Sequence, residues 1–170
     1  MIDFEKAFRR LVKHEGEFSD DPRDPGNWTG GKVGRGELKG TKYGIAANTY
    51  QHLDIKNLTL QQAKEIYLED FWEVLGSAHP AIKFQFFDAA VNHGGGNATR
   101  ILQRAVNVAD DGLWGPRSQA ALNAMDPNDV LLRFIGYRLK FWASLSIFDT
   151  YGRGWTRRGA DNLLLAAEDN

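Results

Sequence analysis

A stretch rich in glycine, proline and aspartate, from Phe18 to Gly44, interrupts a chain whose other parts mostly have the apolar spacing of helices. It opens with an acidic turn around Asp24-Pro25-Gly26 and continues through closely spaced glycines. Short pieces between these turns favour a small, irregular antiparallel hairpin, with its last strand expected over Thr41–Ile45. We therefore predict an α+β protein that is mainly helical, with a small β-hairpin flap near the N-terminus.

The first helix is expected to run from about Asp3 to His14, because one face repeats apolar residues at helical spacing. That stripe consists of Phe4, Phe8, Leu11 and Val12. Glu15 continues the same face, and Gly16 would end the helix directly after it. The pattern thus places a carboxyl group at the end of an apolar helical face.

Helical patterns return after the glycine-rich stretch. Thr59 and Gln62 have the spacing of a capping box, and Pro80 opens a helix that is apolar on most sides and that glycines 94–96 would end. Further helices are expected near Ala98–Val106, from Pro116, from Asp129 to about Leu145, and near Asp161–Glu168. We see no linker or internal repeat, so we expect one domain over residues 1–170.

The composition excludes several classes of protein. A formal net charge of −1 argues against a dedicated nucleic-acid binder. With no cysteine there is no disulfide framework or thiolate site, and the four histidines lack a paired spacing, so we expect neither metal nor cofactor. The first residues are too charged for a secretory signal, and no run approaches the roughly 20 apolar residues of a membrane span. We therefore expect the chain to need another factor to leave the cytoplasm.

Two carboxylates are candidates for glycosidic-bond hydrolysis, which needs an acid and a second group that handles water or positive charge. Burial at the end of an apolar face would raise the pKa of Glu15 and keep it protonated. Asp24, in a flexible acidic turn, can fold back across a cleft and stay ionised, and such unlike environments suit the two roles. The alternatives are that Asp24 only forms a turn and that Glu15 is an ordinary solvated residue.

Ordered motifs along most of the chain strengthen the catalytic interpretation. The first set is Glu15-Gly16-Glu17-Phe18, Asp21-Pro22, Asp24-Pro25-Gly26 and Thr41-Lys42-Tyr43-Gly44-Ile45. The second set is Phe87-Asp88-Ala89-Ala90-Val91-Asn92-His93-Gly94, Leu102-Gln103-Arg104-Ala105, Asp111-Gly112-Leu113-Trp114-Gly115-Pro116 and Gly154-Trp155-Thr156-Arg157-Arg158. The first set resembles glycoside hydrolase family 108, N-acetylmuramidases found as phage endolysins and related bacterial proteins. The second resembles the family's companion peptidoglycan-binding segment.

This resemblance implies a lysozyme-like fold, with a catalytic lobe and flap over residues 1–75 and a helical lobe over residues 76–170. It implies cleavage of the β-1,4 bond between N-acetylmuramic acid and N-acetylglucosamine in peptidoglycan, during phage lysis of a host cell. The enzyme would then wait in the host cytoplasm as a monomer, until a holin lets it reach the periplasmic peptidoglycan.

The resemblance also implies roles for residues. Glu15 corresponds to the catalytic glutamate, and the analogy to lysozyme makes Asp24 the second carboxylate. Glu17 stands where the family has a second glycine, which offers a rival carboxylate. An insertion between Thr29 and Thr41 interrupts the family spacing, so either threonine could be the active-site threonine of phage-type lysozymes.

Candidate substrate contacts are Tyr43, Asn92, His93 and Gln103, because a saccharide cleft needs convergent polar groups and an aromatic platform. Packing is the alternative for Tyr43, as is capping of the buried helix for Asn92 and His93. Trp114 and Trp155 are expected to pack in the core before they bind ligand.

The stretch 133–158 holds many cations and the single acid Asp149. The cations are Arg133, Arg138, Lys140, Arg153, Arg157 and Arg158. Such an excess could attract stem-peptide carboxylates or an anionic envelope, although solvated helix faces produce similar runs.

Three other activities stay open at this stage. A lytic transglycosylase cleaves the same bond without water. A non-catalytic cell-wall-binding module or secretion factor could use the same fold, although it would not need the Glu15-Gly16 and Asp24-Pro25-Gly26 motifs. A chitosanase-like or chitinase-like activity would need only a different cleft.

Overall fold

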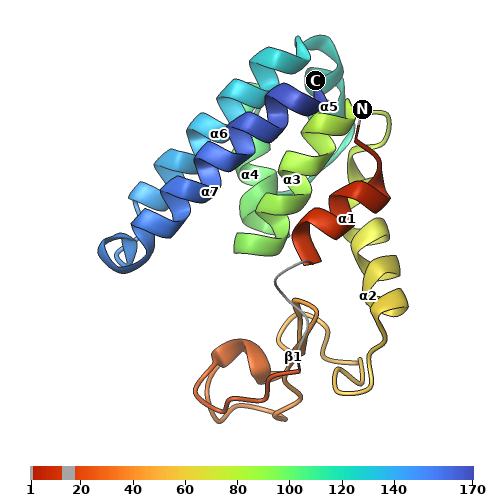
Figure 1. Ribbon diagram of the computed structural model, residues 1–170, viewed down its shortest axis with the longest axis vertical. Coiled ribbons are helices and arrows are strands. Elements are labelled where there is room, and N and C mark those ends of the chain that lie inside the picture. Colours follow the sequence, from red (N-terminus) through yellow and green to blue (C-terminus); the bar gives the residue numbers. More distant parts are fainter. Residues whose placement is uncertain (1, 13–17) are drawn as a thin grey trace. The chain divides into compact units, whose positions relative to one another are not determined.

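The computed structural model describes residues 2–12 and 18–170. The chain divides into two compact units, which we call the N-terminal unit (Glu5–Glu69) and the helical unit (Met1–Phe4 with Asp70–Asn170). The described residues are mainly helical with one small antiparallel sheet, which confirms the predicted class (Figure 1). The expected lobes, 1–75 and 76–170, stay a prediction.

The N-terminal unit combines two short α-helices with a long irregular segment between them. Its elements are α1 (Phe4–Val12, which begins in the helical unit), the 3-10 helix η1 (Pro25–Asn27), β1 (Thr41–Lys42), β2 (Ile45–Ala46) and α2 (Leu60–Tyr67). α2 begins with the predicted capping box, in which Thr59 accepts from the backbone of Gln62 and the Gln62 side chain accepts from the backbone of Thr59. At its other end, Tyr67 packs its ring 6.1 Å from Phe8 of α1.

The sheet corrects one sequence-based prediction. Thr41–Ile45 is not a single strand, because β1 pairs with β2 across a two-residue turn, with Thr41 opposite Ala46. Tyr43 and Gly44 form that turn with φ of 52° and 78°. A tight type I′ turn requires positive φ at both central residues, and glycine adopts it readily. The Tyr43-Gly44 pair therefore encodes a hairpin rather than the interior of a strand.

The helical unit contains five α-helices in the order the sequence predicted. Its elements are the 3-10 helix η3 (Glu73–Leu75), α3 (Pro80–His93), α4 (Gly95–Ala105), α5 (Pro116–Ala124), α6 (Pro127–Ala143) and α7 (Phe148–Asp169), and the π-helical turn η2 (Leu68–Trp72) leads into it. α3 begins at Pro80 and ends before Gly94, whose φ is 84°, as predicted. No helix in the described part of the chain has the length and apolar character to cross a membrane.

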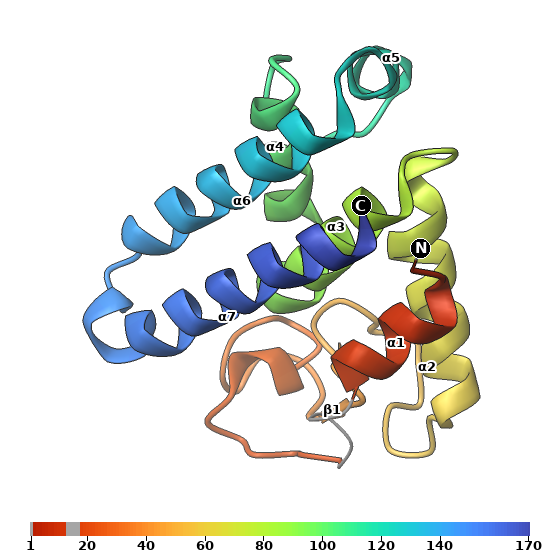
Figure 2. The same cartoon turned by 45° about the horizontal axis from the view of Figure 1, so that its top comes forward.

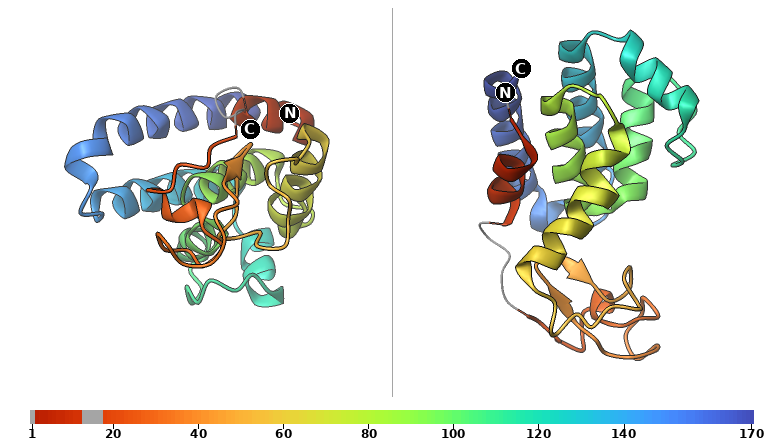
Figure 3. Two further views of the ribbon diagram at one scale, coloured as in Figure 1. Left: turned by 90° about the horizontal axis from the view of Figure 1, so that it is seen from below. Right: turned by 90° about the vertical axis from the view of Figure 1, so that its right-hand side faces the viewer.

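α7 is much longer than the predicted Asp161–Glu168 helix. It begins at Phe148 and runs through three glycines that would each disfavour an isolated helix by about 1 kcal/mol. Packing against α6 offsets that cost, since a Cβ at Gly159 would lie 2.8 Å from Leu139 of α6. Figures 2 and 3 show α6 and α7 side by side and joined at one end by the turn 144–147. Gly159 thus permits a close helix pair.

The core of the helical unit forms around α3, which is buried over most of its length. Its largest fully buried apolar side chains come from α3, α4 and α6 and from the end of η3: Phe84, Phe86, Phe87, Ile101, Leu102, Phe134, Ile135, Trp142 and Leu75. The predicted central position of this helix is therefore confirmed.

A buried ion pair lies inside this core. Asp88 of α3 pairs with Arg138 of α6 at 2.5 Å, and it accepts hydrogen bonds from Arg158 of α7 at 2.7 Å and from Asn162 of α7 at 2.9 Å. Burial alone would raise the pKa of Asp88, but the two guanidinium groups and the Asn162 amide lower it below its usual value. One carboxylate therefore ties three helices together.

We predict that Asp88→Asn destabilises the protein by about 3 kcal/mol or more, because it leaves the Arg138 guanidinium buried without a counter-charge. Asp161→Asn, at an exposed position of α7, is the matched control and should change the free energy of unfolding by less than about 0.5 kcal/mol. Urea unfolding at neutral pH measures both. Equal effects of the two variants would contradict the assigned role.

Candidate functional site

The sequence-predicted site residues fall on both units. Glu15, the expected acid, and its rival Glu17 lie outside the described residues. Asp24, Thr29, Thr41 and Tyr43 belong to the N-terminal unit, whereas Asn92, His93 and Gln103 belong to the helical unit. The described candidates for the second carboxylate and the active-site threonine therefore all lie in the N-terminal unit.

Asp24 is exposed and serves as the N-cap of η1. Its Oδ1 accepts from the backbone N–H of Gly26 at 2.8 Å, and its own N–H donates to Asp21 O at 3.1 Å. The alternative interpretation, that this aspartate forms a turn, is thus part of the answer. The cap also holds a carboxylate at the surface in a defined orientation, which a catalytic role would require.

Asn27 is a residue that the sequence analysis missed. It is completely buried, and its amide donates to Asp21 O at 3.0 Å and accepts from the Thr41 hydroxyl at 2.7 Å. Its backbone carbonyl accepts from the N–H groups of Lys39 and Gly40. The Asp24 turn, the insertion and the β-hairpin therefore all meet at one residue. The only signal for it was a polar residue in a turn sequence, which is common at solvated positions.

The two threonines have different surroundings. The hydroxyl of Thr41 is used by the buried Asn27, which is a structural bond. Thr29 accepts from the backbone N–H of Glu37 at 2.9 Å, and it lines an open hollow. Thr29 is therefore the threonine of this pair that faces a space a ligand could enter.

Tyr43 owes its position to the hairpin turn. Its carbonyl accepts from the Tyr67 hydroxyl at 2.7 Å, which ties the turn to the end of α2. Its ring is half-buried, with the Lys42 ammonium 5.4 Å from the ring centre. The packing role is therefore visible, and the predicted saccharide contact stays a prediction.

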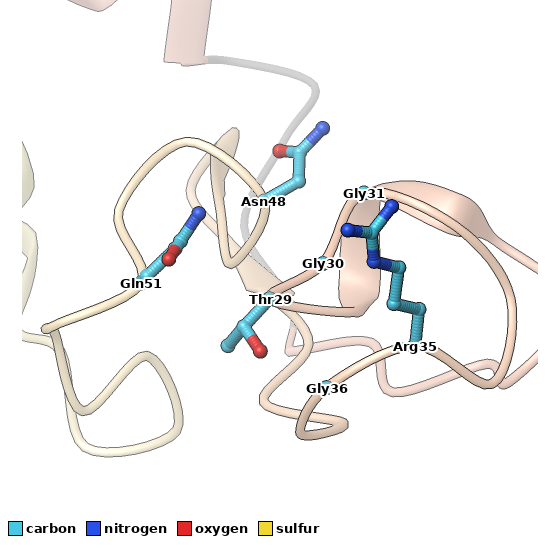
Figure 4. Close-up of a pocket in the computed structure, with 7 residues that line it drawn as sticks. All are labelled: Thr29, Gly30, Gly31, Arg35, Gly36, Asn48 and Gln51. Carbon is cyan, nitrogen blue, oxygen red and sulfur yellow. The ribbon is translucent and has the colours of Figure 1, made fainter.

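The hollow beside Thr29 has a volume of about 580 Å³ (Figure 4). It is lined by Thr29, Gly30, Gly31, Arg35, Gly36, Asn48 and Gln51. A second hollow of about 470 Å³ is lined by Phe18, Asp20, Leu38, Lys39, His52, Leu53, Asp54, Ile55 and Lys56. Of the residues that the structure describes, those of the first hollow are polar with one cation and no acid, and those of the second mix both charges with apolar side chains.

His93 is packed rather than poised for chemistry. Its ring lies 5.1 Å from the Phe141 ring and 5.9 Å from the Trp142 ring, and its Nδ1 lies 3.1 Å from Asn92 Oδ1. Burial, and then the positive charge of Arg138, lower the pKa of His93 to about 3. This side chain is therefore neutral at physiological pH, while the neighbouring Asn92 is exposed.

Gln103 is buried, and its side chain organises the loop before α5. Its amide donates to Asp111 Oδ1 at 2.7 Å and to Leu113 O at 3.0 Å, and its Oε1 accepts from Gly112 N at 2.9 Å. With 1% of its surface exposed, it gives no support to the predicted glycan contact. The resemblance of the Asp111-Gly112 segment to a binding motif here corresponds to a hydrogen-bonded loop.

The basic stretch 133–158 is partly internal. Arg138 and Arg158 pair with Asp88, and Arg133 donates to Ala105 O and Asn107 Oδ1. Trp155 stacks on Trp142 at 6.3 Å between centroids, as expected for packing. Half of the cations thus have structural partners, and envelope attraction by the others stays a prediction. Within residues 2–12 and 18–170, no group of three histidines or acids could hold a metal ion.

Comparison with solved structures defines the class of protein. The chain is similar to SagA of Brucella abortus, with a TM-score of 0.78 and 27% sequence identity, covering 98% of this chain and 94% of that one. The fold is therefore lysozyme-like and mainly α, as the sequence predicted. The comparison with curated proteins gave no match.

The family model of glycosyl hydrolase 108 matches residues 8–94. The chain belongs to this family, and it is a glycoside hydrolase. The matched range contains Glu15, Asp24, Thr29, Thr41 and Tyr43, together with Asn92 and His93.

We predict that Asn27→Ala costs about 2 kcal/mol or more, because it leaves the Thr41 hydroxyl and the Asp21 carbonyl without their buried partner. Asn57→Ala, at an exposed position of the same unit, is the control and should cost less than about 1 kcal/mol. Thermal and urea unfolding compare the two. A loss at position 27 no greater than at position 57 would show that Asn27 does not hold the loops.

A second prediction concerns pH. Between pH 6.5 and about 3 the unfolded chain binds a proton at position 93 that the folded protein does not, so the free energy of unfolding falls as pH falls through this window. His93→Phe should lose less stability than wild type between pH 7 and pH 4.5. The exposed His52→Gln is the control. An imidazole of His93 that titrates above pH 5 by NMR would refute the assignment.

Proposed function

We propose that the protein is an N-acetylmuramidase that hydrolyses the β-1,4 bond between N-acetylmuramic acid and N-acetylglucosamine in peptidoglycan. Membership of glycosyl hydrolase family 108 and the similarity to SagA support a peptidoglycan hydrolase. The observation that carries the proposal is the family match over residues 8–94, a range that includes Glu15, the expected acid, and Asp24, which caps η1.

In the proposed mechanism Glu15 protonates the glycosidic oxygen of the leaving sugar. The exposed carboxylate of Asp24 orients or activates the attacking water, and the cap on η1 keeps this carboxylate in one orientation. The Thr29 hydroxyl, at the rim of the polar hollow, is the better candidate for a contact with water or sugar than the Thr41 hydroxyl. Carboxyl groups roughly 6.5–9.5 Å apart would give inversion, and about 5–5.5 Å would give retention.

The proposal extends to a role as a phage endolysin in host cell lysis. The motif resemblance supports this extension, since such enzymes are found in that family. The protein would be stored in the host cytoplasm as a monomer and reach the wall when a holin opens the inner membrane.

We expect Glu15→Gln to lower lytic activity at least about 10³-fold, because the amide keeps the shape of the side chain and cannot supply the proton. Asp24→Asn should lower it about 10²-fold or more, with the η1 cap preserved by the amide oxygen. Clearing of sacculi measures the rates. Glu17→Gln is the control and should keep most of the activity. Wild-type rates for Glu15→Gln, with loss in Glu17→Gln, would move the acid to position 17.

Product analysis of digested sacculi by mass spectrometry tests the reaction type. We expect products with reducing N-acetylmuramic acid ends, which form when water attacks. Anhydro ends would identify a lytic transglycosylase instead, and cleavage of chitin alone would identify a chitinase-like enzyme. An inactive but wall-binding protein would indicate a binding module or secretion factor.

A further inference from the structure

The polar hollow beside Thr29 is formed by two walls of the N-terminal unit. Figure 4 shows Arg35 on one wall and Asn48 and Gln51 on the other, with the backbone of Gly30 and Gly31 between them. The volume of about 580 Å³ lies within the range of small-molecule sites. The hollow is therefore large enough for a sugar residue with its substituents.

The Arg35 wall is built by the insertion that separates the two family motifs. Backbone hydrogen bonds fold it back on itself, from Gly30 N to Arg35 O at 3.0 Å and from Thr29 N to Glu37 O at 2.9 Å. A Cβ at Gly30 would lie 2.5 Å from Arg35 Cγ, so this close approach requires glycine there. The wall is held by its backbone, and the Arg35 side chain is left on the surface for a ligand.

The opposite wall is tied to the same framework. The N–H of Asn48 donates to Gly26 O at 3.0 Å, and the Gln51 carbonyl accepts from the Lys39 ammonium at 2.8 Å. Both bonds use backbone atoms of Asn48 and Gln51. Their side-chain amides line the hollow, and the Asn48 Oδ1 also accepts from the neighbouring Thr49 hydroxyl at 3.1 Å.

The lining has a specific chemical character. Among the described residues it contains one guanidinium group, two amides, one hydroxyl and four glycine or threonine backbones, and no acid or large apolar side chain. A guanidinium is always charged, and its planar fork matches a carboxylate with two parallel hydrogen bonds. Amides donate and accept, which suits sugar hydroxyl and acetamido groups. The complementary ligand is thus a sugar that carries a carboxylate.

We infer that this hollow is a glycan subsite that recognises a carboxylate-bearing sugar, with Arg35 pairing the carboxylate and Asn48 and Gln51 binding hydroxyl or acetamido groups. The inference rests on the proposed function, which supplies such a glycan. Two sources share this chemistry, the lactyl carboxylate of a peptide-free muramic acid and a carboxylate of an attached stem peptide.

Calorimetry with the Glu15→Gln variant of this chain tests the inference. The substitution is expected to prevent turnover, so that binding of the probes alone is measured. The probes are a peptide-free oligomer of alternating N-acetylmuramic acid and N-acetylglucosamine, the same oligomer with stem peptides, and a neutral N-acetylglucosamine oligomer of equal length. We expect at least one charged probe to bind more tightly than the neutral one. The tighter of the two charged probes identifies the source of the carboxylate.

Arg35→Ala and Arg35→Gln, added to this background, should each weaken binding of the charged probe about tenfold and leave the neutral probe unchanged. Lys32→Ala removes the same charge from the same insertion at a position that does not line the hollow, and it should change neither. Asn48→Ala and Gln51→Ala should weaken the binding of every probe that occupies the hollow.

The subsite would be overturned by equal losses in Arg35→Ala and Lys32→Ala, by an equal loss for the neutral and charged probes, by no binding of any probe, or by normal binding of the charged probe to Arg35→Ala. Circular dichroism of each variant checks that the unit stays folded, as its backbone bonds predict. The assay requires no cleavage, so its outcome is separate from that of product analysis. If the wild-type protein cleaves sacculi but Arg35→Ala still binds the charged probe normally, the subsite is refuted and the proposed function is not.

Discussion

The packing of the helical unit depends on the interactions of the buried Asp88 carboxylate with α6 and α7. An isolated charge in such a core would cost many kcal/mol, and here two guanidinium groups and an amide from α6 and α7 compensate it. Three helices must reach their final positions before the charge is fully paired. The carboxylate therefore favours one arrangement of α3, α6 and α7 over alternatives that apolar packing alone would tolerate. The same arrangement surrounds His93 with rings and positive charge and keeps its imidazole neutral.

In the N-terminal unit, the buried residue that joins separate segments is a neutral amide, Asn27. Its irregular segment buries few apolar side chains and has only two-residue strands, so regular structure contributes little to its stability. Asn27 compensates by satisfying backbone and side-chain groups from three separate turns at one buried point. Because the loops are fixed through Asn27 and through their own backbone, the exposed Arg35 side chain is left for a ligand, whereas the Asp24 carboxylate also caps η1. Both side chains are exposed, so catalysis and ligand binding can use them.

The sequence predicted the parts of this structure that local patterns determine. Apolar periodicity, the Thr59 capping box and Pro80 located the helices, because these signals act within a few residues. It missed the first half of α7, which holds Gly152 and Gly154 and runs beside α6. The partners of Asp88 lie 50 or more residues away in sequence, and Asn27 meets Thr41 14 residues away, so neither spacing nor composition could reveal them. For the same reason, Arg138 and Arg158 looked like a surface patch.

This contrast also explains what the ordered motifs mean. Asp88 and Arg158 each lie in a motif that carried the family resemblance, and they meet inside the protein rather than at a ligand. The hairpin motif around Tyr43 and Gly44 likewise encodes a turn geometry. Where the motifs specify the framework, substrate specificity is expected to depend on the residues between the motifs. The insertion from Thr29 to Thr41 is such a segment, because its backbone closes on itself and the Thr29 and Arg35 side chains line a hollow. Differences in glycan preference within this fold are therefore expected to arise from such inserted loops, while the framework around Asn27 and the hairpin stays the same.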